Sequence, residues 1–440
     1  MRLTRKLFIT SLVLYFLSQI LFLVNIQFPR GHNFDEFHYV PSAKQFLELK
    51  QNQNWEHPPL GKEIMAAGIA VWGDRPIGWR FMSTIFGSLT LVGMFLWGFA
   101  VFRSYNTALW IALITVSNQL LYVQARIGML DTFMFAFLVW GLAGFSAAWR
   151  ADLRPEQTSK FLIFSGLMFG LATACKWAAI VPWAVCVGLV IVVRLFQSWG
   201  TSFKNMSSDD WYHPDLWQGI RWYQWVLWLG VFPLIVYAIT FTPLFFVPGT
   251  KHGLLDIIPE LIRMQVRMYE GQLRVVTNHP YMSHWSGWAI LKRPIWYAFD
   301  REIGPENRVR GVLLLGNPLI MWTGLLALVA CLWGWLECRA RDAFLVFVFY
   351  AAFYFPWAVI PRKISFYYYY YPAGMTLGLA LAYVFHYGEQ AEGPFLRKHW
   401  PRLLFLAVSF ALFIYFFPIL SALKIPGDSF QKWMWRPSWI

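Results

Sequence analysis

Two adjacent carboxylic acids, Asp35 and Glu36, follow the first long hydrophobic segment of the chain by only a few residues. Residues 7–26 form an apolar run that can cross a bilayer, because about 20 residues rising ~1.5 Å each span the hydrocarbon. The acids therefore lie just beyond one membrane face, where an ionisable side chain is a functional candidate by default. A carboxylate there can accept the proton of an attacking hydroxyl. The alternative is a pair of solvated interfacial acids.

The composition predicts an all-α integral membrane protein. The chain of 440 residues is 58% hydrophobic and 14% charged, whereas soluble proteins carry about 25% charged residues. The net charge of +14 comes without a long basic run, so it does not indicate a nucleic-acid partner. Basic residues in cytoplasmic loops explain part of this charge. Binding of anionic lipid or of a phosphate-bearing substrate would explain the rest.

The apolar runs predict about eleven transmembrane helices that form one domain over residues 1–440, with a break at Cys175-Lys176-Trp177 between the fifth and sixth. The predicted spans are 7–26, 79–101, 106–122, 128–149, 160–175, 177–196, 224–247, 310–336, 342–361, 364–387 and 402–421.

The short loops predict the orientation of these spans. Arg2, Arg5 and Lys6 place the N-terminus in the cytoplasm, because basic loops stay inside. Alternation then puts the other basic short loops inside and the long loops 27–78 and 248–309 outside, and an odd number of spans puts the C-terminus outside. The first segment is predicted to be an uncleaved helix, since it is too long for a signal-peptide core.

This topology brings ionisable residues from five separate connections to the outer face. They are Asp35/Glu36, His57/Lys62, Arg126/Asp131, Lys176 and Arg362/Lys363. Two acids among several cations suggest transfer from a phosphate-linked donor: the acid takes a proton, while Arg and Lys hold the phosphate as its negative charge grows. The alternative is that outer loops simply hold many charges.

The first outer loop contains a rigid element that can hold side chains in place. Trp55-Glu56-His57-Pro58-Pro59-Leu60-Gly61-Lys62 combines a Pro-Pro step with a His and a Lys. Before it, Pro41 to Asn52 reads as a short amphipathic helix on the membrane surface, with Pro41 at its start, or as a plain helical connector.

Cysteine and metal signals are weak. Cys175, Cys186, Cys331 and Cys338 lie in or beside apolar segments without metal-type spacing, so each is predicted to be a small buried hydrophobe, with no disulfide and no cysteine-bound zinc. A divalent cation is possible, because four side chains could supply ligands, but no fixed spacing defines a site: Asp35, Glu36, His57 and Asp131.

Seven motifs in order give the chain a specific resemblance. Phe34-Asp35-Glu36, followed by His57-Pro58-Pro59-Leu60-Gly61-Lys62, resembles the protein O-mannosyltransferase family of C-type glycosyltransferases. Further matches, which together extend the resemblance from Phe34 to Pro372, are Gly78-Trp79-Arg80, Ala125-Arg126 to Leu130-Asp131-Thr132, Thr173-Ala174-Cys175-Lys176-Trp177, Ser283-His284-Trp285 to Arg293-Pro294, Gly316-Asn317-Pro318, and Pro356-Trp357 through Pro361-Arg362 to Tyr371-Pro372.

The resemblance implies an inverting membrane enzyme that moves mannose, or a similar hexose, from a polyprenyl phosphate to Ser or Thr of a translocated protein. Asp35 maps onto the general base, and Glu36 would orient the site or a neighbouring cation. Arg126, Lys176 and Arg362, at the outer ends of spans, are expected to include the phosphate-holding cations. The full set of expected substrate-binding residues is His57, Lys62, Arg80, Arg126, Asp131, Lys176, Arg362 and Lys363.

The implied partners are a polyprenyl-phosphate-sugar donor, membrane lipids and a protein acceptor that is met near the secretion machinery, and the implied location is a bacterial inner membrane. The 248–309 loop is too short for the β-trefoil domain of eukaryotic members and lacks a strand-rich pattern, so its outer loops are expected to be helical, as in a compact bacterial form. The cluster Tyr367 to Tyr371 leads straight to Pro372 without the His-Tyr pair of eukaryotic members, and it is predicted to be an aromatic belt or a sugar-stacking wall.

Two other functions stay open from the sequence. One is a related transferase that uses the same donor and modifies a lipid or a glycan. The other, more remote, is a transporter, although transporters place ionisable groups near mid-membrane and often show repeated halves, and neither feature is present in this sequence.

Overall fold

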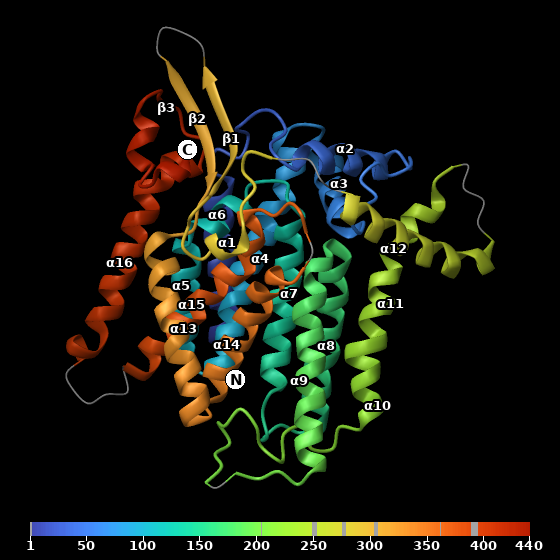
Figure 1. The fold of residues 1–440 in the computed structure, drawn as a ribbon, viewed down its shortest axis with the longest axis vertical. Helices are drawn as coiled ribbons and strands as arrows, with labels where there is room; N and C mark the ends of the chain where they lie inside the picture. Colours follow the sequence, from blue (N-terminus) through green and yellow to red (C-terminus); the bar gives the residue numbers. More distant parts are fainter. Residues whose placement is uncertain are drawn as a thin grey trace.

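The computed structural model describes residues 2–203, 205–248, 253–274, 279–302, 307–360, 362–388 and 395–440. These residues form a bundle of long helices with a layer of short helices and strands over one end (Figure 1). The long helices are α1 (Arg2–Leu23), α4 (Pro76–Phe102), α7 (Leu130–Ala148), α8 (Pro155–Cys175), α9 (Ile180–Ser198), α13 (Pro318–Cys338), α15 (Tyr371–Gly388) and α16 (Phe395–Leu420).

Eight helical stretches are long and apolar enough to cross a membrane, among the residues that the structure describes. Three of the eleven predicted spans fall instead on helices that do not meet this criterion: α5 (Tyr105–Ser117) with α6 (Gln119–Gln124), α14 (Arg341–Tyr354) and α15. The span predicted at 224–247 is built from α10 (Trp222–Trp225), a π-helical turn at Val226–Val231, α11 (Phe232–Ile239) and the 3-10 turn η3 (Thr242–Phe246).

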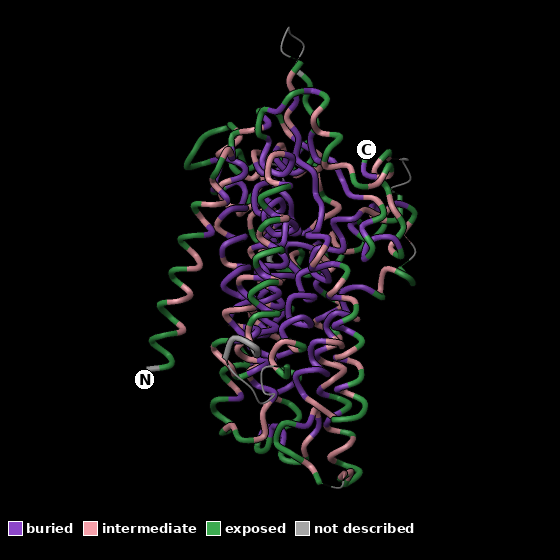
Figure 2. The backbone as a smooth tube through the Cα atoms, turned by 90° about the vertical axis from the view of Figure 1, so that its left-hand side faces the viewer, coloured by how far each residue is buried: buried purple, intermediate pink, exposed green. Residues whose placement is uncertain are grey.

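The centre of the bundle is formed by α4 and α7. Most of the apolar window of α7 is buried, whereas α1 is largely exposed and flanks the bundle (Figure 2). Close packing of α4 depends on Gly87, because a Cβ there would lie 2.3 Å from the Cβ of Ala125. This contact sets the segment that carries Arg126 directly against α4.

The expected break between the fifth and sixth spans is confirmed. Helix α8 ends at Cys175, Lys176 adopts an extended backbone (φ −161°, ψ 135°), and a 3-10 turn, η1 (Trp177–Ala179), leads into α9. The extended residue turns the Lys176 side chain out of the helical path and toward α7.

The prediction of purely helical outer loops is wrong. Strands β1 (Ile295–Glu302) and β2 (Arg308–Leu314) form an antiparallel hairpin that pairs Ile295 with Leu314, and β3 (Ile425–Pro426) adds to β2. The span predicted at 310–336 therefore begins in a strand, and its helix starts only at Pro318. Strand β2 is buried along most of its length, so its residues read as one apolar run with the helix that follows.

The predicted surface helix from Pro41 to Asn52 is also displaced. Helix α2 covers Glu36–Leu47 with Pro41 inside it, and a second short helix, α3 (Leu60–Trp72), follows the Pro-Pro step. The start of α2 at Glu36 matters for the site, because it places Asp35 at the N-terminal end of a helix.

Two further predictions, on the cysteines and on the segment 389–402, are only partly matched or partly covered by the structure. All four cysteines are free thiols, but Cys338 is exposed at the end of α13 rather than buried. The predicted cytoplasmic segment 389–402 lies partly outside the described residues, which omit 389–394.

Candidate active site

The five connections that carry the predicted site residues meet at one end of the bundle. They are the α1–α2 link, the α2–α3 loop, the α6–α7 link, the α8–η1 break and the segment before η7 (Tyr367–Tyr370), and they lie beneath the layer of short helices and strands (Figure 1). In this structure the predicted site residues divide into a group with atoms available for a substrate and a group bound within the fold.

Asp35 is presented by a strained backbone. The preceding Phe34 has a positive φ of 51°, in the left-handed region that costs a non-glycine residue about 1–3 kcal/mol. The Phe34 ring packs edge-on against His279 and Phe366, with centroids 5.3 and 5.4 Å away. This aromatic packing holds the strained residue and fixes the start of α2 directly after Asp35.

The Asp35 carboxylate is free for chemistry, since it does not cap its helix. Its Oδ2 accepts hydrogen bonds from the hydroxyls of Tyr39 (3.2 Å) and Tyr368 (3.4 Å). Burial raises the pKa of Asp35, the charge of Lys176 opposes that rise, and the charge of Asp131 adds to it. A carboxylate with a raised pKa is a better proton acceptor than an exposed one.

Glu36 has a different environment from its neighbour. It forms a fully buried ion pair with Arg80, whose Nε–H and Nη2–H donate to the two carboxylate oxygens at 2.8 Å each. The backbone N–H groups of Asn33 (2.9 Å) and Gly128 (2.8 Å) donate to the same carboxylate. Glu36 thus joins α4, the α1–α2 link and the α6–α7 link into one unit beneath Asp35.

Lys176 and Asp131 form a second buried ion pair at the break after α8. The Nζ–H of Lys176 donates to Oδ2 of Asp131 at 2.7 Å, and both side chains are at most 5% exposed. The same ammonium lies 4.9 Å from the ring centroid of Tyr368 and 5.1 Å from that of Tyr369. Tyr368 therefore stands between Lys176 and Asp35 and contacts both.

Arg362 and Lys363 are neighbours in sequence but not in environment. The Arg362 guanidinium lies 5.1 Å from the ring centroid of Tyr369, which in turn stacks flat on Trp357 (4.3 Å, 1°). Among the described residues its buried Nε has no hydrogen-bond partner. Lys363 is exposed and does not line the cavity described next.

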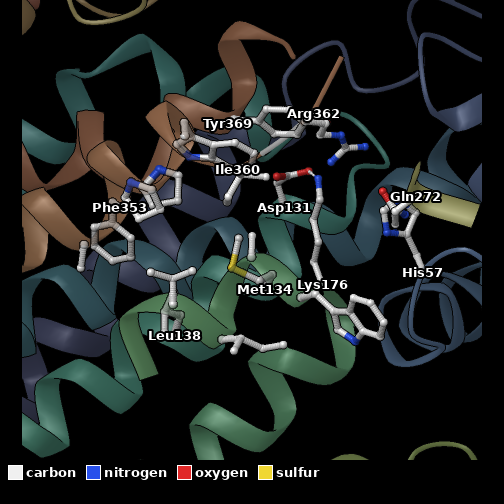
Figure 3. Close-up of a pocket in the computed structure, with 18 of the residues that line it drawn as sticks. His57, Asp131, Met134, Leu138, Lys176, Gln272, Phe353, Ile360, Arg362 and Tyr369 are labelled. Atoms are coloured by element: carbon white, nitrogen blue, oxygen red, sulfur yellow. Dashed lines mark hydrogen bonds and ion pairs between the residues drawn. The ribbon is translucent and has the colours of Figure 1, made fainter. Parts of the chain in front are cut away.

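A cavity of about 390 Å³ opens beneath these cations (Figure 3). Asp131, Lys176 and Arg362 lie together at its polar end, with His57 and Gln272 opposite them. Its remaining wall is apolar and descends between the long helices, through Met134, Leu138, Ile180, Val181 and Phe353. Because Asp131, Met134 and Leu138 lie on one face of α7, the wall changes from charged to apolar along a single helix. This arrangement suits an anionic head group with a hydrocarbon tail.

His57 lies at the mouth of this cavity, with its ring edge-on to that of Tyr39 at 5.9 Å. Burial lowers the pKa of His57 well below its usual range, and Lys176, Lys62 and Arg362 add to the effect. The imidazole is therefore neutral at physiological pH and can give a hydrogen bond but not a charge.

Lys62 points away from the cavity and fastens the loop that carries His57. Its Nζ donates to the carbonyl oxygens of His57 (2.9 Å) and Asn54. Burial lowers the pKa of Lys62 to about 7. Its contacts indicate support of the loop.

Arg126 is likewise bound by the chain itself. It donates to the carbonyl oxygens of Phe22 (3.3 Å), Val24 (2.8 Å) and Leu420 (3.1 Å). These bonds tie the ends of α1 and α16 to the α6–α7 link. Of the three cations expected to include the phosphate ligands, Lys176 and Arg362 line the cavity and Arg126 does not.

The sequence reasoning missed several residues of the site. Tyr39 follows Asp35 by four residues, a helical spacing that would have indicated contact had the start of α2 been predicted. Tyr367 to Tyr370 are all buried, which is incompatible with a lipid-facing belt, and the sugar-stacking wall stays a prediction. Gln272, from the segment 248–309, had no pattern in the sequence that indicated a role in the site. Within the described ranges, no three His, Cys, Asp or Glu side chains gather as a metal site would require.

Family models match two consecutive parts of the chain. Residues 75–247 match "Dolichyl-phosphate-mannose-protein mannosyltransferase", and residues 257–439 match "C-terminal four TMM region of protein-O-mannosyltransferase".

Similar proteins are known from bacteria. A polyprenol-phosphate-mannose–protein mannosyltransferase from Corynebacterium glutamicum is 25% identical, over 92% of this chain and 88% of the relative. One of the same description from Mycobacterium tuberculosis is 25% identical, over 92% of this chain and 86% of its own length.

Solved structures share the fold. A chain of a Saccharomyces cerevisiae protein O-mannosyltransferase complex bound to the sugar donor matches with a TM-score of 0.78 at 14% identity, covering 99% of this chain and 93% of the other. ArnT from Cupriavidus metallidurans bound to undecaprenyl phosphate matches with a TM-score of 0.59 at 16% identity, covering 97% of this chain and 68% of the other.

Proposed function

We propose a reaction for this chain from one premise, which is that the chain belongs to the protein O-mannosyltransferase family. The reaction is the transfer of mannose from a polyprenyl-phosphate donor to the hydroxyl of a Ser or Thr side chain in a protein. The observation that carries it is the arrangement of the Asp35 carboxylate, which forms no ion pair among the described residues, beside a cavity that is cationic at its mouth and apolar below.

The donor phosphate would lie between Lys176 and Arg362, with its polyprenyl chain descending along the apolar wall. Lys176 supplies a point charge, and the Nε–H of Arg362, which has no partner among the described residues, supplies a directed hydrogen bond. Both cations gain interaction energy as negative charge develops on the departing phosphate, so they favour the transition state over the bound donor. Neutral His57 offers a further hydrogen bond to the sugar or the phosphate.

Asp35 would act as the general base. The acceptor hydroxyl approaches the anomeric carbon from the side opposite the phosphate and gives its proton to the Asp35 carboxylate. The new bond joins the acceptor oxygen to the anomeric carbon, and the electron pair of the broken bond leaves with the polyprenyl phosphate. A single displacement inverts the anomeric configuration. Tyr39 and Tyr368 hold the carboxylate in position through their hydroxyls.

The remaining residues would position this site. Glu36 and Arg80 fix the backbone under Asp35, and Lys62 fixes the loop of His57. Asp131 holds Lys176 in the cavity. Arg126 braces the ends of two long helices.

We also propose the setting of the enzyme. The chain crosses a bacterial inner membrane eleven times as one domain, with the site on the outer side, and meets its acceptor near the secretion machinery. Support for eleven crossings comes from the helices found within each of the eleven predicted ranges.

The test is transfer in a defined system. Purified protein in lipid vesicles is given polyprenyl-phosphate mannose and a Ser- or Thr-containing peptide, with the same peptide carrying Ala as the matched control. We expect mannosyl peptide, with anomeric configuration opposite to that of the donor, from the first peptide alone. If mannose is transferred to added glycan or lipid but not to the peptide, the enzyme modifies a glycan or a lipid and the proposed protein acceptor is wrong.

A further inference from the structure

Helix α12 (Ile257–Arg274) presents three separate stripes of side chains. One stripe is buried against the rest of the protein and includes Glu260, Met268 and Gly271. The second is charged and exposed: Arg263, Arg267, Glu270 and Arg274. The third is apolar and exposed, with spacing of three or four residues that keeps it on one face: Ile258, Ile262, Val266, Tyr269 and Leu273, which are 50–69% exposed.

The position of α12 is fixed by contacts at its middle and near its C-terminal end. The Tyr237 hydroxyl of α11 donates to Gln265, and Gln272 donates to the carbonyl oxygen of Glu56 at 2.8 Å. Gly271 packs against Trp55, where a Cβ would lie 2.7 Å from the indole ring. The helix therefore lies across the outer end of α11 and runs in toward α2 and α3 (Figure 1).

A second exposed apolar surface lies on α11 and η3. Helix α11 is part of a candidate membrane span, and its Leu234, Ile235 and Ile239 are 50–63% exposed; Phe246 of η3 is 70% exposed. An apolar stripe beside such a surface, with three arginines on the adjoining stripe, has the pattern of a helix that lies in the membrane interface and contacts anionic lipid.

We propose that α12 is an interfacial helix whose apolar stripe lies in the outer leaflet and forms the doorway through which the lipid donor enters the cavity. Tyr269 and Leu273 belong to the stripe and also line the cavity. A polyprenyl chain can therefore pass from the bilayer into the cavity over continuous apolar surface, while its phosphate moves toward Lys176 and Arg362. The doorway rests on the proposed function, whereas the interfacial position does not.

The inner end of this doorway is connected to the cation site. Tyr237, which donates to Gln265 of α12, accepts a hydrogen bond from the Trp177 indole N–H at 3.0 Å. Trp177 follows Lys176 directly and lines the same cavity. The position of α12 is thereby linked through two hydrogen bonds to the segment that holds the phosphate ligand.

Fluorescence tests the interfacial position without any activity assay. In a cysteine-free background, Ile262→Cys on the apolar stripe and Glu270→Cys on the charged stripe are each labelled with an environment-sensitive dye and reconstituted in phosphatidylcholine–phosphatidylglycerol vesicles. We expect blue-shifted emission, quenched by spin-labelled lipid, at position 262 and water-like emission at 270. Water-like emission at both positions, or a shielded dye at 262 that lipid does not quench, as against a protein partner, would overturn the proposal.

Kinetics test the doorway. The variant I262D/V266D should raise the apparent KM for a long-chain donor in vesicles at least about tenfold, the equivalent of ~1.4 kcal/mol. Its kcat/KM with a short-chain, water-soluble donor in detergent should stay within about twofold of the wild type, which also shows that the variant folds. Glu270→Gln is the matched control and should change neither value. An equal loss with both donors would overturn the doorway, whereas no transfer by the wild type from either donor would count against the proposed function instead.

Discussion

At the scale of single residues, the two adjacent acids do different work because their surroundings differ. Asp35 accepts hydrogen bonds from two tyrosines, while Glu36 is fully buried and paired with Arg80. Two residues that are adjacent in sequence therefore have different roles: Asp35 is the candidate base, and Glu36 is a structural anchor.

Asp35→Asn removes the proton acceptor and keeps the shape of the side chain. We expect turnover to fall by on the order of a hundred- to ten-thousand-fold, because a protein hydroxyl is a poor nucleophile at neutral pH. Donor binding and thermal unfolding should stay near the wild type. Mannose transfer to a Ser/Thr peptide by the purified variant is the measurement. If the Asp35→Asn variant kept wild-type turnover, another residue would be the base, and Asp131 would be the next candidate.

The pH dependence follows from the environment of Asp35. Burial raises the pKa of this carboxyl group, so activity should be lost on acidification with a midpoint above that of an exposed aspartate. The Tyr39 hydroxyl stabilises the charged form and lowers the pKa, so Tyr39→Phe should shift the acidic limb of kcat to higher pH. A shift to lower pH, or none, would contradict this role; Tyr15→Phe, on the distant α1, is the control.

The donor cations allow a comparison of neighbours. Arg362→Ala should weaken donor use by about 2–5 kcal/mol, because a desolvated phosphate loses a charged partner. Lys363→Ala, next in sequence but exposed, should leave the donor KM unchanged. Donor titration in vesicles at fixed peptide concentration measures both. Equal KM values for the two variants would remove Arg362 from the phosphate site.

At the scale of elements, the site depends on links between segments far apart in the chain. The α1–α2 link, α4 and the α6–α7 link meet at one carboxylate, and Lys62 fastens the α2–α3 loop. These links hold side chains from separate helices in one geometry, which efficient transfer requires.

Glu36→Gln tests this linkage. The amide cannot neutralise the buried Arg80, and removing one partner of such a pair typically costs about 3–5 kcal/mol. We expect Glu36→Gln to lower the unfolding temperature in detergent. Asp35→Asn, at the neighbouring position, should leave it unchanged. An unchanged unfolding temperature for both would mean that the ion pair does not stabilise the fold.

At the scale of the whole molecule, the bundle separates two surfaces. The site, the strands and the short helices lie at one end, and the basic loop around Asp152 lies at the other. The positive-inside rule predicts that this second end faces the cytoplasm.

Cysteine labelling tests this orientation in intact cells. In a cysteine-free background, Lys50→Cys and Asp152→Cys place exposed thiols at the two ends of the bundle. A membrane-impermeant reagent should modify position 50 from outside and spare position 152 until the cells are opened. The reverse pattern would invert the topology and place the site in the cytoplasm.

The sequence by itself determined the class, the family resemblance and the acid pair. Helices that face lipid must be long, apolar and poor in charged residues, and these features are visible directly in the sequence. The motifs around Asp35, His57 and Lys176 are short and contiguous, so they can be recognised in the sequence without knowledge of the tertiary structure.

Only the tertiary structure decided which charges have atoms free for a substrate. Arg80 and Arg126 look as available in sequence as Arg362, but their partners come from segments 44 to 294 residues away. The residues of strand β2 look in sequence like the start of a helix, because burial on both faces removes the alternation that marks a strand. Partners and burial arise when distant segments pack together, and no local pattern of residues encodes them.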